Sequence, residues 1–355
     1  MGGSSAAIAA VMRGETLSQG EQKIVMKILF AGTPAFAVQP LEMLIKTCEV
    51  VAVITQEDKI QGRKKLLTPS PVKTCALSHN LPVFQPQKIR EHIDRLKSFK
   101  ADAMITCAYG QILTQEVLDC FPKGVWNIHA GLLPAYRGAS PVQSCILNGE
   151  TETGVCVMQT VLALDAGDIL LCEKLKIGEK ETAGELSNRL SALSAALIQK
   201  AAPLIESGAY TLQKQGETGA HIYRKITREQ AKIDFTAPAP EIVNQIRAMN
   251  PEPVAFSYLR GAIVNFYAAE VVPNAALSEE QKKAKCGEVL TDKPKSGLLV
   301  RCGACETNGA CETNGASENN AGAIKINFIQ PAGGKIMTGA DFLNGKKAVK
   351  GEIFE

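Results

Sequence analysis

The sequence predicts an α/β domain with a mainly parallel sheet, followed by a small β domain of barrel or sandwich type. In the first half of the chain, continuous apolar runs alternate with amphipathic segments, as in repeated βαβ units. Short β-like runs follow one another closely in the last third, and a polar, glycine-containing stretch separates the two parts. Two domains are expected because the chain has 355 residues, whereas single cores rarely grow beyond about 250–300 residues.

The composition is that of an ordinary globular protein. A net charge of +3 is too small to indicate a nucleic-acid-binding protein by itself, although it leaves room for a local basic patch. The 11 cysteines are spread along the chain without a secretory signal, so most are expected to be reduced thiols of a cytoplasmic protein, with an organelle as the alternative. No apolar run has the length of a membrane span.

The chain is expected to contain five segments. Residues 1–25 are rich in Gly, Ser and Ala and precede a natural start at Met26, which predicts a disordered leader or a cloning remnant. The other segments are a catalytic α/β domain at 26–207, a linker at 208–226, a β domain at 227–355 and, within it, a flexible insert at 303–320. The insert reads GACETN-GACETN-GASENN and lacks the aliphatic residues that a core requires.

The opening of the α/β domain has the shape of a nucleotide-binding βαβ unit. The apolar run 24–31 predicts a central strand, a Gly-Thr-Pro turn leads into a helix over 35–46, and 50–55 predicts the second strand. The turn has neither GxGxxG nor GxxxxGK spacing, so a dinucleotide or P-loop ligand is poorly supported.

The connection at 56–72 is long for an α/β unit and carries clustered cations. These are Lys59, Arg63, Lys64 and Lys65. Such a cluster suits a phosphate backbone, and a solvated basic loop explains it equally well.

The remaining elements continue the alternation of helices and strands. In the α/β domain, helices are predicted at 71–79, 89–99, 140–147 and 182–205, and strands near Val83 and at 103–108, 125–129, 154–162 and 169–175. Thr182 and Glu185 have the spacing of a capping box. The β domain is predicted to contain a helix at 241–249 and strands at 255–259, 263–271, 287–290, 297–302 and 324–330.

The stretch 125–141, VWNIHAGLLPAYRGASP, contains the first candidate catalytic residues. Asn127 and His129 interrupt its apolar run two positions apart, so an amide and an imidazole share one face of a strand. They emerge at the carboxyl end of that strand, which is the edge of an open α/β sheet where ligands bind. Residues 109–113 follow another strand and are expected nearby.

Asp165, in the turn LDAGD after a further strand, is the candidate third group, although an acid in such a turn is usually a turn former. The three side chains offer an amide donor, a group that titrates near neutrality and a carboxylate. No serine or cysteine of the central stretch is placed as a nucleophile, which favours direct transfer. An amine would attack a carbonyl carbon while the amide and imidazolium N–H groups stabilise the oxyanion.

Other candidate ligands are weaker. Cys302 and Cys305 form a CxxC pair, but no second pair follows at zinc-finger spacing, so no metal is predicted. His79, His92 and His221 each stand alone among polar neighbours and are expected at the surface.

Several motifs closely resemble the methionyl-tRNA formyltransferase family of folate-dependent enzymes, and the likeness extends over nearly the whole chain from Met26. These motifs are FAGTP at 30–34, TQEDKIQGRKK at 55–65, PSPVK at 69–73, AYGQIL at 108–113, NIHAGLLPAYRGASP at 127–141, LDAGD at 164–168, AKIDF at 231–235, MNPEP at 249–253 and QPAGGKIMTGADFLNG at 330–345.

The resemblance implies a Rossmann-like formyltransferase domain and an OB-like C-terminal barrel that binds tRNA. It also implies 10-formyltetrahydrofolate as donor and initiator methionyl-tRNA as acceptor. The chain is further expected to be a monomer that binds no metal and no membrane. The residues that match the family's catalytic set are Asn127, His129 and Asp165. Those that match its folate pocket are Tyr109, Gly110, Gln111, Ile112, Leu113, Gly131, Leu132, Leu133, Pro134, Val161 and Leu164, and those that match its tRNA-binding loop are Arg63, Lys64 and Lys65.

The sequence departs from the family pattern in two motifs. The usual HGSLLP reads HAGLLP here, so the serine hydroxyl is absent at Gly131. The usual loop TQPDRPAGRGKK has Glu57 and Ile60 in place of its prolines and Lys59 in place of its arginine, and it is one glycine shorter after Arg63. A more flexible loop is expected.

The catalytic residues alone leave other functions open. The same domain resembles glycinamide ribonucleotide formyltransferases, amino-sugar formyltransferases and formyltetrahydrofolate hydrolases, and an inactive RNA-binding protein is a further alternative. The basic connection at 56–72 and the C-terminal domain favour tRNA as the acceptor.

Overall fold

The computed structural model describes residues 24–61, 66–217, 219–291, 293–303 and 322–355. They form two compact units. The first comprises the chain up to Pro141 with 152–176 and 187–223, and the second comprises 142–151, 177–186 and 224–355. The predicted leader before Ile24 and the predicted insert after Gly303 lie outside the described residues.

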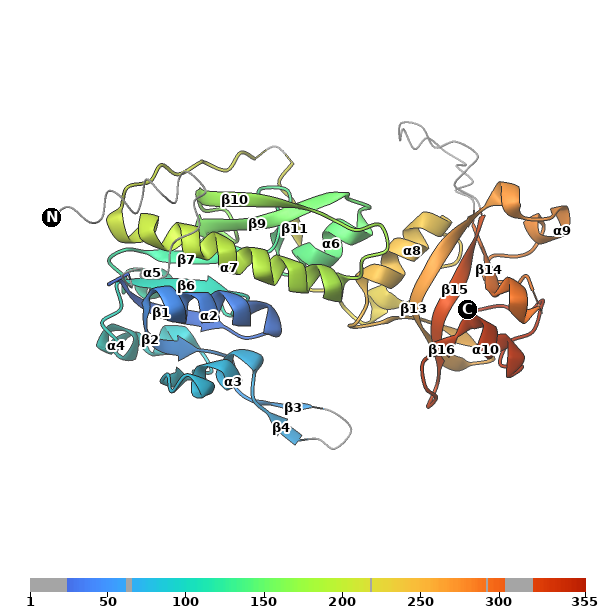
Figure 1. Cartoon of the computed structure of the whole chain (residues 1–355), viewed down its shortest axis with the longest axis horizontal. Helices are drawn as coiled ribbons and strands as arrows, with labels where there is room; N and C mark the ends of the chain where they lie inside the picture. Colours follow the sequence, from blue (N-terminus) through green and yellow to red (C-terminus); the bar gives the residue numbers. More distant parts are fainter. Residues whose placement is uncertain (1–23, 62–65, 218, 292, 304–321) are drawn as a thin grey trace. The chain divides into compact units, whose positions relative to one another are not determined.

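The first unit is built on a seven-stranded sheet with the order β10-β9-β7-β6-β1-β2-β5 (Figure 1). The strands are β1 (Lys27–Gly32), β2 (Glu49–Ile54), β5 (Val83–Phe84), β6 (Ala103–Cys107), β7 (Val125–His129), β9 (Glu152–Gln159) and β10 (Ile169–Lys176). The five strands from β5 to β7 are parallel, whereas β9 is antiparallel to β7 and β10 is antiparallel to β9. The prediction of a mainly parallel sheet is confirmed.

Alternate residues of a strand point to opposite faces of the sheet, and the central strands are buried on both faces, so helices cover the sheet. On one face, Leu29, Met104 and Val125 join a buried cluster with side chains of η2 (Ile89–Glu91), α4 (Ile93–Ser98) and α5 (Gln115–Leu118). Two further helices, α2 (Val38–Thr47) and α7 (Ala183–Ser207), run in front of the strands in Figure 1.

Local contacts explain the position of α7 beside α2 and the residue at which α7 begins. The hydroxyl of Ser191 on α7 donates to the carbonyl of Phe36 in η1 (Ala35–Ala37), 2.7 Å away, which places α7 beside the start of α2. The predicted capping box is present, since Thr182 N–H donates to Glu185 Oε2 (2.9 Å) and Glu185 N–H donates to Thr182 Oγ1 (3.3 Å).

The long connection after β2 contains a hairpin that the sequence did not predict. Its strands are β3 (Lys59–Gln61) and β4 (Leu66–Thr68), and it projects from the first unit in Figure 1. The candidate tRNA-binding residues Arg63, Lys64 and Lys65 lie outside the described residues.

The helix that follows, α3 (Pro71–Ser78), fixes the base of this hairpin. Ser70 caps the helix by accepting from Lys73 N–H (3.0 Å), and its hydroxyl lies 2.7 Å from that of Thr55 at the end of β2. Lys73 Nζ forms an ion pair with Asp58 Oδ2 (2.7 Å), which lowers the pKa of that carboxyl. Both ends of the connection are therefore tied to one helix turn.

The second unit contains a curled antiparallel sheet with the order β12-β13-β15-β14, and β16 pairs with β15. The strands are β12 (Ala255–Leu259), β13 (Ala262–Pro273), β14 (Leu298–Cys302), β15 (Gly322–Pro331) and β16 (Met337–Thr338), and the helices are η3 (Glu229–Ala231), α8 (Ala239–Ala248), η4 (Asn274–Ala276), α9 (Glu279–Lys282), η5 (Pro294–Ser296) and α10 (Gly339–Asn344). The predicted small β domain is confirmed, in the form of a half-barrel.

One predicted strand of this unit, 287–290, forms isolated bridges instead of a ladder. Glu288 pairs with Ile353, and its neighbour Val289 pairs with Val300. Because successive residues pair with two different segments, no continuous strand develops.

The cysteines follow the prediction with one exception. Seven described cysteines are thiols, whereas Cys156 of β9 and Cys172 of β10 form a disulfide. Of the CxxC pair, Cys302 is buried in β14 and Cys305 lies outside the described residues. In the part of the chain that the structure describes, no helix has the length and apolarity needed to cross a membrane.

Candidate active site

Strand β7 presents two of the candidate residues on one face. Val125, Asn127 and His129 alternate along it, so the face that buries Val125 in the core becomes polar toward the end of the strand. The hydroxyl of Thr106, on β6, donates to Asn127 Oδ1 at 2.9 Å. Because the amide oxygen accepts this bond, the NH₂ group of Asn127 is the end that can donate to a reacting oxygen.

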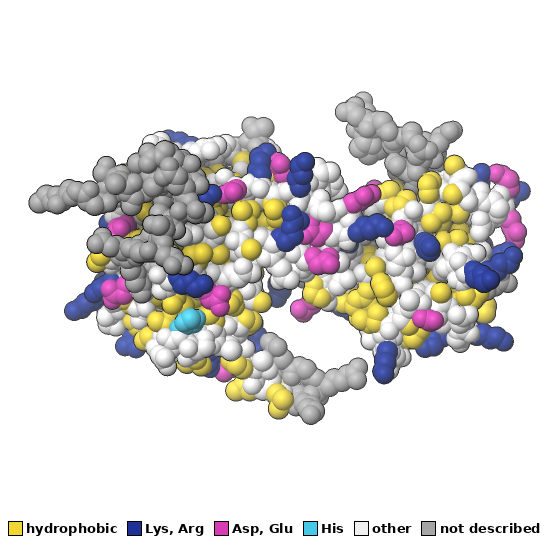
Figure 2. Space-filling model, viewed as in Figure 1, with side chains coloured by type: hydrophobic (Ala, Val, Ile, Leu, Met, Phe, Trp, Pro, Cys, Tyr) yellow, Lys and Arg dark blue, Asp and Glu magenta, His cyan; other side chains and the backbone are white. Residues whose placement is uncertain are grey.

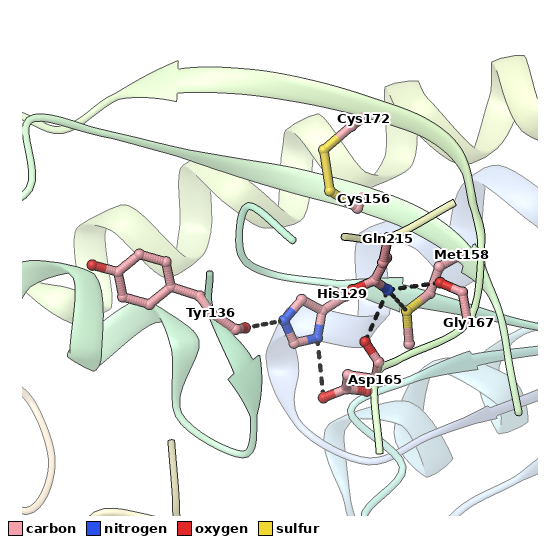
Figure 3. Close-up of a disulfide and its surroundings, with 8 residues drawn as sticks. All are labelled: His129, Tyr136, Cys156, Met158, Asp165, Gly167, Cys172 and Gln215. Carbon is pink, nitrogen blue, oxygen red and sulfur yellow. Dashed lines mark hydrogen bonds and ion pairs between the residues drawn. A yellow bond between two sulfur atoms is a disulfide. The ribbon is translucent and has the colours of Figure 1, made fainter. Parts of the chain in front are cut away.

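His129 is buried, and its neighbours show which of its two ring nitrogens carries a fixed hydrogen. Its Nε2 lies 2.6 Å from the carbonyl oxygen of Tyr136. A carbonyl can only accept, so Nε2 carries a hydrogen. The other nitrogen, Nδ1, faces Asp165 Oδ2 at 3.7 Å (Figure 3). Nδ1 is therefore the ring atom that can gain or lose a proton in a reaction.

Asp165 reaches this position by a route that the sequence did not indicate. Since β9 is antiparallel to β7, the carboxyl end of β9 lies beside the amino end of β7, where Thr160 N–H donates to Val125 O (2.8 Å). The loop 160–168 must therefore return toward His129. Asp165 has a left-handed backbone conformation (φ 48°), and its Oδ2 accepts from Gly138 N–H at 2.7 Å.

Gln215 holds this loop in place and was missed by the sequence reasoning. Its Nε2 donates to the carbonyl oxygens of Asp165 (2.9 Å) and Gly167 (2.6 Å) and lies 3.7 Å from Met158 Sδ (Figure 3). Its Oε1 accepts from Arg137 Nη2 (2.9 Å) and Nε (3.1 Å). A glutamine in a polar linker gives no signal of such a role, because all of these partners are distant in sequence.

The segment 209–223, here called the strap, therefore belongs to the first unit, although the sequence assigned it to the linker at 208–226. Its short strand β11 (Ile222–Tyr223) pairs with β8 (Arg137–Gly138), and the Tyr136 and Tyr223 rings stack 5.1 Å apart. Gly138 has φ +103°, and a Cβ there would collide with the Tyr223 backbone, so this contact requires glycine.

The opposite strand supplies an apolar wall beside the polar residues. Cys156 pairs with His129 and Met158 with Asn127, and opposed residues of antiparallel strands share a face. Leu133 packs against Cys156 and Met158. The Cys156–Cys172 disulfide therefore lies one strand away from His129 (Figure 3).

The candidate folate-binding residues fall into two groups. Those of the first group are buried or anchored: the carbonyl of Tyr109 accepts from Thr33 Oγ1 (3.2 Å), Gln111 binds backbone atoms of Pro86 and Ile89, and Leu113 packs against the core. Those of the second group are apolar side chains at the surface, with exposed fractions of 83% for Ile112, 42% for Val161 and 57% for Leu164.

Tyr109 and Gly131 show how closely this region is packed. Burial raises the pKa of the Tyr109 phenol, and its hydroxyl has no hydrogen-bond partner among the described residues. A Cβ added at Gly131 would lie 2.9 Å from Pro141 Cβ and 3.1 Å from Tyr136 Cβ. The glycine that replaces the family's serine therefore lets the loop after His129 approach α6 (Pro141–Leu147) closely.

The described part of the β3–β4 hairpin exposes three apolar side chains. Ile60, Leu66 and Leu67 expose 69%, 62% and 68% of their surface. Figure 2 shows hydrophobic surface on the hairpin, which Figure 1 locates at the lower edge of the view. The sequence reasoning considered only the cations of this connection and missed its exposed apolar residues.

The fold and comparisons with known families define the class of this protein. The family model for formyl transferases matches residues 26–202, and the model for the formyl transferase C-terminal domain matches residues 225–347. This chain belongs to the formyltransferase family.

Relatives identify the branch of that family. A methionyl-tRNA formyltransferase of Xanthomonas axonopodis pv. citri is 39% identical over 91% of this chain and 98% of its own length. Proteins of the same name from Bacillus velezensis (40% identical, 92% of this chain and 97% of theirs) and Fusobacterium nucleatum (36%, 92% and 99%) are similar throughout. The chain is therefore a member of the methionyl-tRNA formyltransferases.

Solved structures support the fold. An N-formyltransferase from Helicobacter canadensis, in complex with folinic acid and dTDP-3-aminofucose, superposes with a TM-score of 0.60 at 18% identity, covering 85% of this chain and 99% of that chain. HypX from Aquifex aeolicus in complex with tetrahydrofolic acid gives a TM-score of 0.56 at 17% identity, covering 93% and 51%.

Proposed function

We propose that this chain transfers the formyl group of 10-formyltetrahydrofolate to the amino group of initiator methionyl-tRNA, as a monomer in the cytoplasm. The observation that carries the proposal is the convergence of Asn127, His129 and Asp165, with His129 Nδ1 3.7 Å from Asp165 Oδ2. The acceptor is supported by the name that its relatives share over their full length.

Asn127 and His129 would act on the formyl oxygen. As the amine nitrogen attacks the formyl carbon, negative charge develops on that oxygen, and the Asn127 NH₂ group and a proton on His129 Nδ1 can stabilise it. Nε2 is already committed to Tyr136 O, so it cannot serve in this role. The buried setting of His129 strengthens such an interaction, because water does not compete for it.

Asp165 would manage the protons of the reaction. Its carboxylate can accept the proton that the amine nitrogen loses once that nitrogen has attacked the formyl carbon. The new C–N bond forms as the bond between the formyl carbon and N10 of the folate breaks, and the leaving nitrogen takes up a proton. The atoms balance without any further reactant.

The two substrates would be held by different sets of residues. Ile112, Val161 and Leu164 expose apolar surface that the flat faces of the folate ring system would cover, and backbone groups of the 131–134 loop would bond to its polar edges. Arg63, Lys64 and Lys65 would contact the phosphates of the acceptor arm, and the C-terminal half-barrel would bind the remainder of the tRNA.

The experiment offers labelled formyl donor in parallel to methionyl-initiator-tRNA, uncharged tRNA, glycinamide ribonucleotide and an amino-sugar nucleotide, and it measures released formate. Label on the charged tRNA alone is the expected result. Label on glycinamide ribonucleotide or on the amino-sugar nucleotide would show that the acceptor is a small amine and not tRNA. Released formate without any labelled acceptor would indicate a hydrolase.

A further inference from the structure

A second cluster of chemically reactive side chains lies between α2 and α3, outside the candidate active site. It consists of Glu42 on α2, Cys75 on α3 and His79 at the end of α3. One carboxylate oxygen, the thiol sulfur and one imidazole nitrogen all lie within 4.8 Å of one another. Cys75 and His79 are four positions apart, which places both side chains on one face of the helix.

The backbone around this cluster is fixed by hydrogen bonds and packing. His79 is the C-cap of α3, and Leu81 N–H donates to Ala76 O at 2.9 Å in the manner of a closed helix end. Glu42 is held by α2, whose neighbouring residues Leu41 and Leu44 are completely buried. The three ligand atoms therefore do not depend on a loop for their positions.

We propose that Glu42, Cys75 and His79 bind a zinc ion. A thiolate, an imidazole and a carboxylate are the three ligand types that Zn²⁺ accepts in proteins, and three protein ligands leave a fourth tetrahedral position for water. Mg²⁺ and Ca²⁺ require oxygen ligands and are disfavoured by the sulfur and nitrogen donors.

The surroundings of the three side chains fit this role. None of them makes a hydrogen bond or ion pair to another described residue through its side chain. Zinc binding would displace the proton of the Cys75 thiol, because the thiolate is the form that binds the metal. The sequence predicted His79 to lie alone at the surface because its adjacent residues are polar. It did not indicate the two partners, because Cys75 is one helix turn away and Glu42 is on another helix.

A zinc ion here would connect α2 with the helix that anchors the hairpin. The first turn of α3 holds Thr55 through Ser70 and Asp58 through Lys73, and the metal ligands lie at the other end of the same helix. Binding that is specific for the folded chain stabilises it by mass action. Zinc is therefore expected to raise the temperature of unfolding.

The test uses the full-length protein treated with a chelator and then titrated with Zn²⁺ alone. Calorimetry should show one zinc site in the parent protein, and substitution of a ligand should remove it. Saturating zinc should raise the unfolding midpoint of the parent by several degrees. Co²⁺, as a spectroscopic substitute, should give a thiolate charge-transfer band. Because even indirect partners of metal ligands contribute about 10–100-fold in affinity, loss of a direct ligand in His79→Ala or Cys75→Ser should weaken binding by about 100-fold or more.

Matched variants separate this site from adventitious thiol binding. Cys120→Ser removes a comparable thiol elsewhere and should leave zinc affinity and the Co²⁺ band unchanged. His79 is exposed and Glu42 is half-buried, so His79→Ala and Glu42→Gln should fold even if Cys75→Ser does not. Equal affinity for the parent, His79→Ala and Glu42→Gln proteins would overturn the proposal, as would a Co²⁺ band that survives Cys75→Ser.

Discussion

The two parts of the candidate active site are held in different ways. Asn127 and His129 belong to β7, which is paired with a neighbouring strand on each side. Asp165 belongs to the loop 160–168, has a left-handed backbone conformation and depends on hydrogen bonds from Gly138 and Gln215. The amide and imidazole are thus positioned by the sheet, and the carboxylate is positioned by side-chain and backbone contacts outside it.

This difference indicates which part of the site can change independently. Moving β7 would require breaking the sheet, whereas removing the contact from Gln215 would release the Asp165 loop and leave the strand intact. The distance of 3.7 Å between His129 Nδ1 and Asp165 Oδ2 is therefore set from the Asp165 side. Substitutions in the two parts should differ in size and in kind.

The largest effect is expected for the strand residues. Asn127→Ala and His129→Ala each remove a proposed donor to the developing oxyanion and should lower kcat by about 10²–10³-fold. Initiator tRNA affinity, measured by filter binding, should stay close to that of the parent, because neither side chain is a proposed tRNA contact. Unchanged turnover in both variants would remove these residues from the mechanism.

A smaller effect is expected for the residue that holds the loop. Gln215→Ala should lower kcat about tenfold, equivalent to about 1.4 kcal/mol, because Asp165 would no longer be fixed beside His129. KM for both substrates should change by less than about twofold, since Gln215 is a positioning residue and binding is left intact. Steady-state kinetics with each substrate varied in turn measure both quantities.

Gln213→Ala is the matched control for the strap. Gln213 lies two positions before Gln215 and its side chain is exposed, while its backbone pairs with Ile169. This variant should keep the parent kcat. A Gln215→Ala protein that is as active as Gln213→Ala would show that the loop holds Asp165 without the strap.

The sequence could predict the strand-borne part of the site but not the contacts that complete it. Alternation of polar and apolar residues places Asn127 and His129 on one face of β7, and that pattern is local. The Asp165–Gln215 contact spans 50 positions. Because β9 is antiparallel to β7, the loop after β9 begins at the amino end of β7, at the opposite edge of the sheet from His129. Neither fact leaves a periodic signal, so Asp165 could be proposed as a catalytic group while its supports remained hidden.

The fold shows the same division. Continuous apolar runs predicted the parallel strands because burial on both faces leaves a local pattern. The β3–β4 hairpin was missed because its strands, Lys59–Gln61 and Leu66–Thr68, are short and their apolar side chains are exposed. Strap residues were assigned to a linker because polar composition predicts exposure, whereas Gln215 and Arg137 satisfy each other inside the first unit.

The smallest expected effect tests whether the sheet alone orients Asn127. Thr106 Oγ1 donates to Asn127 Oδ1 at 2.9 Å, and valine has nearly the same shape without the hydroxyl. Losing one such bond costs about 1 kcal/mol, so Thr106→Val should lower kcat about fivefold. Thr106→Ser keeps the hydroxyl and should retain most of the activity, with kcat measured for both. If the two variants were equally active, β7 would orient the amide without help, and the contrast with the hydrogen-bonded Asp165 loop would become sharper.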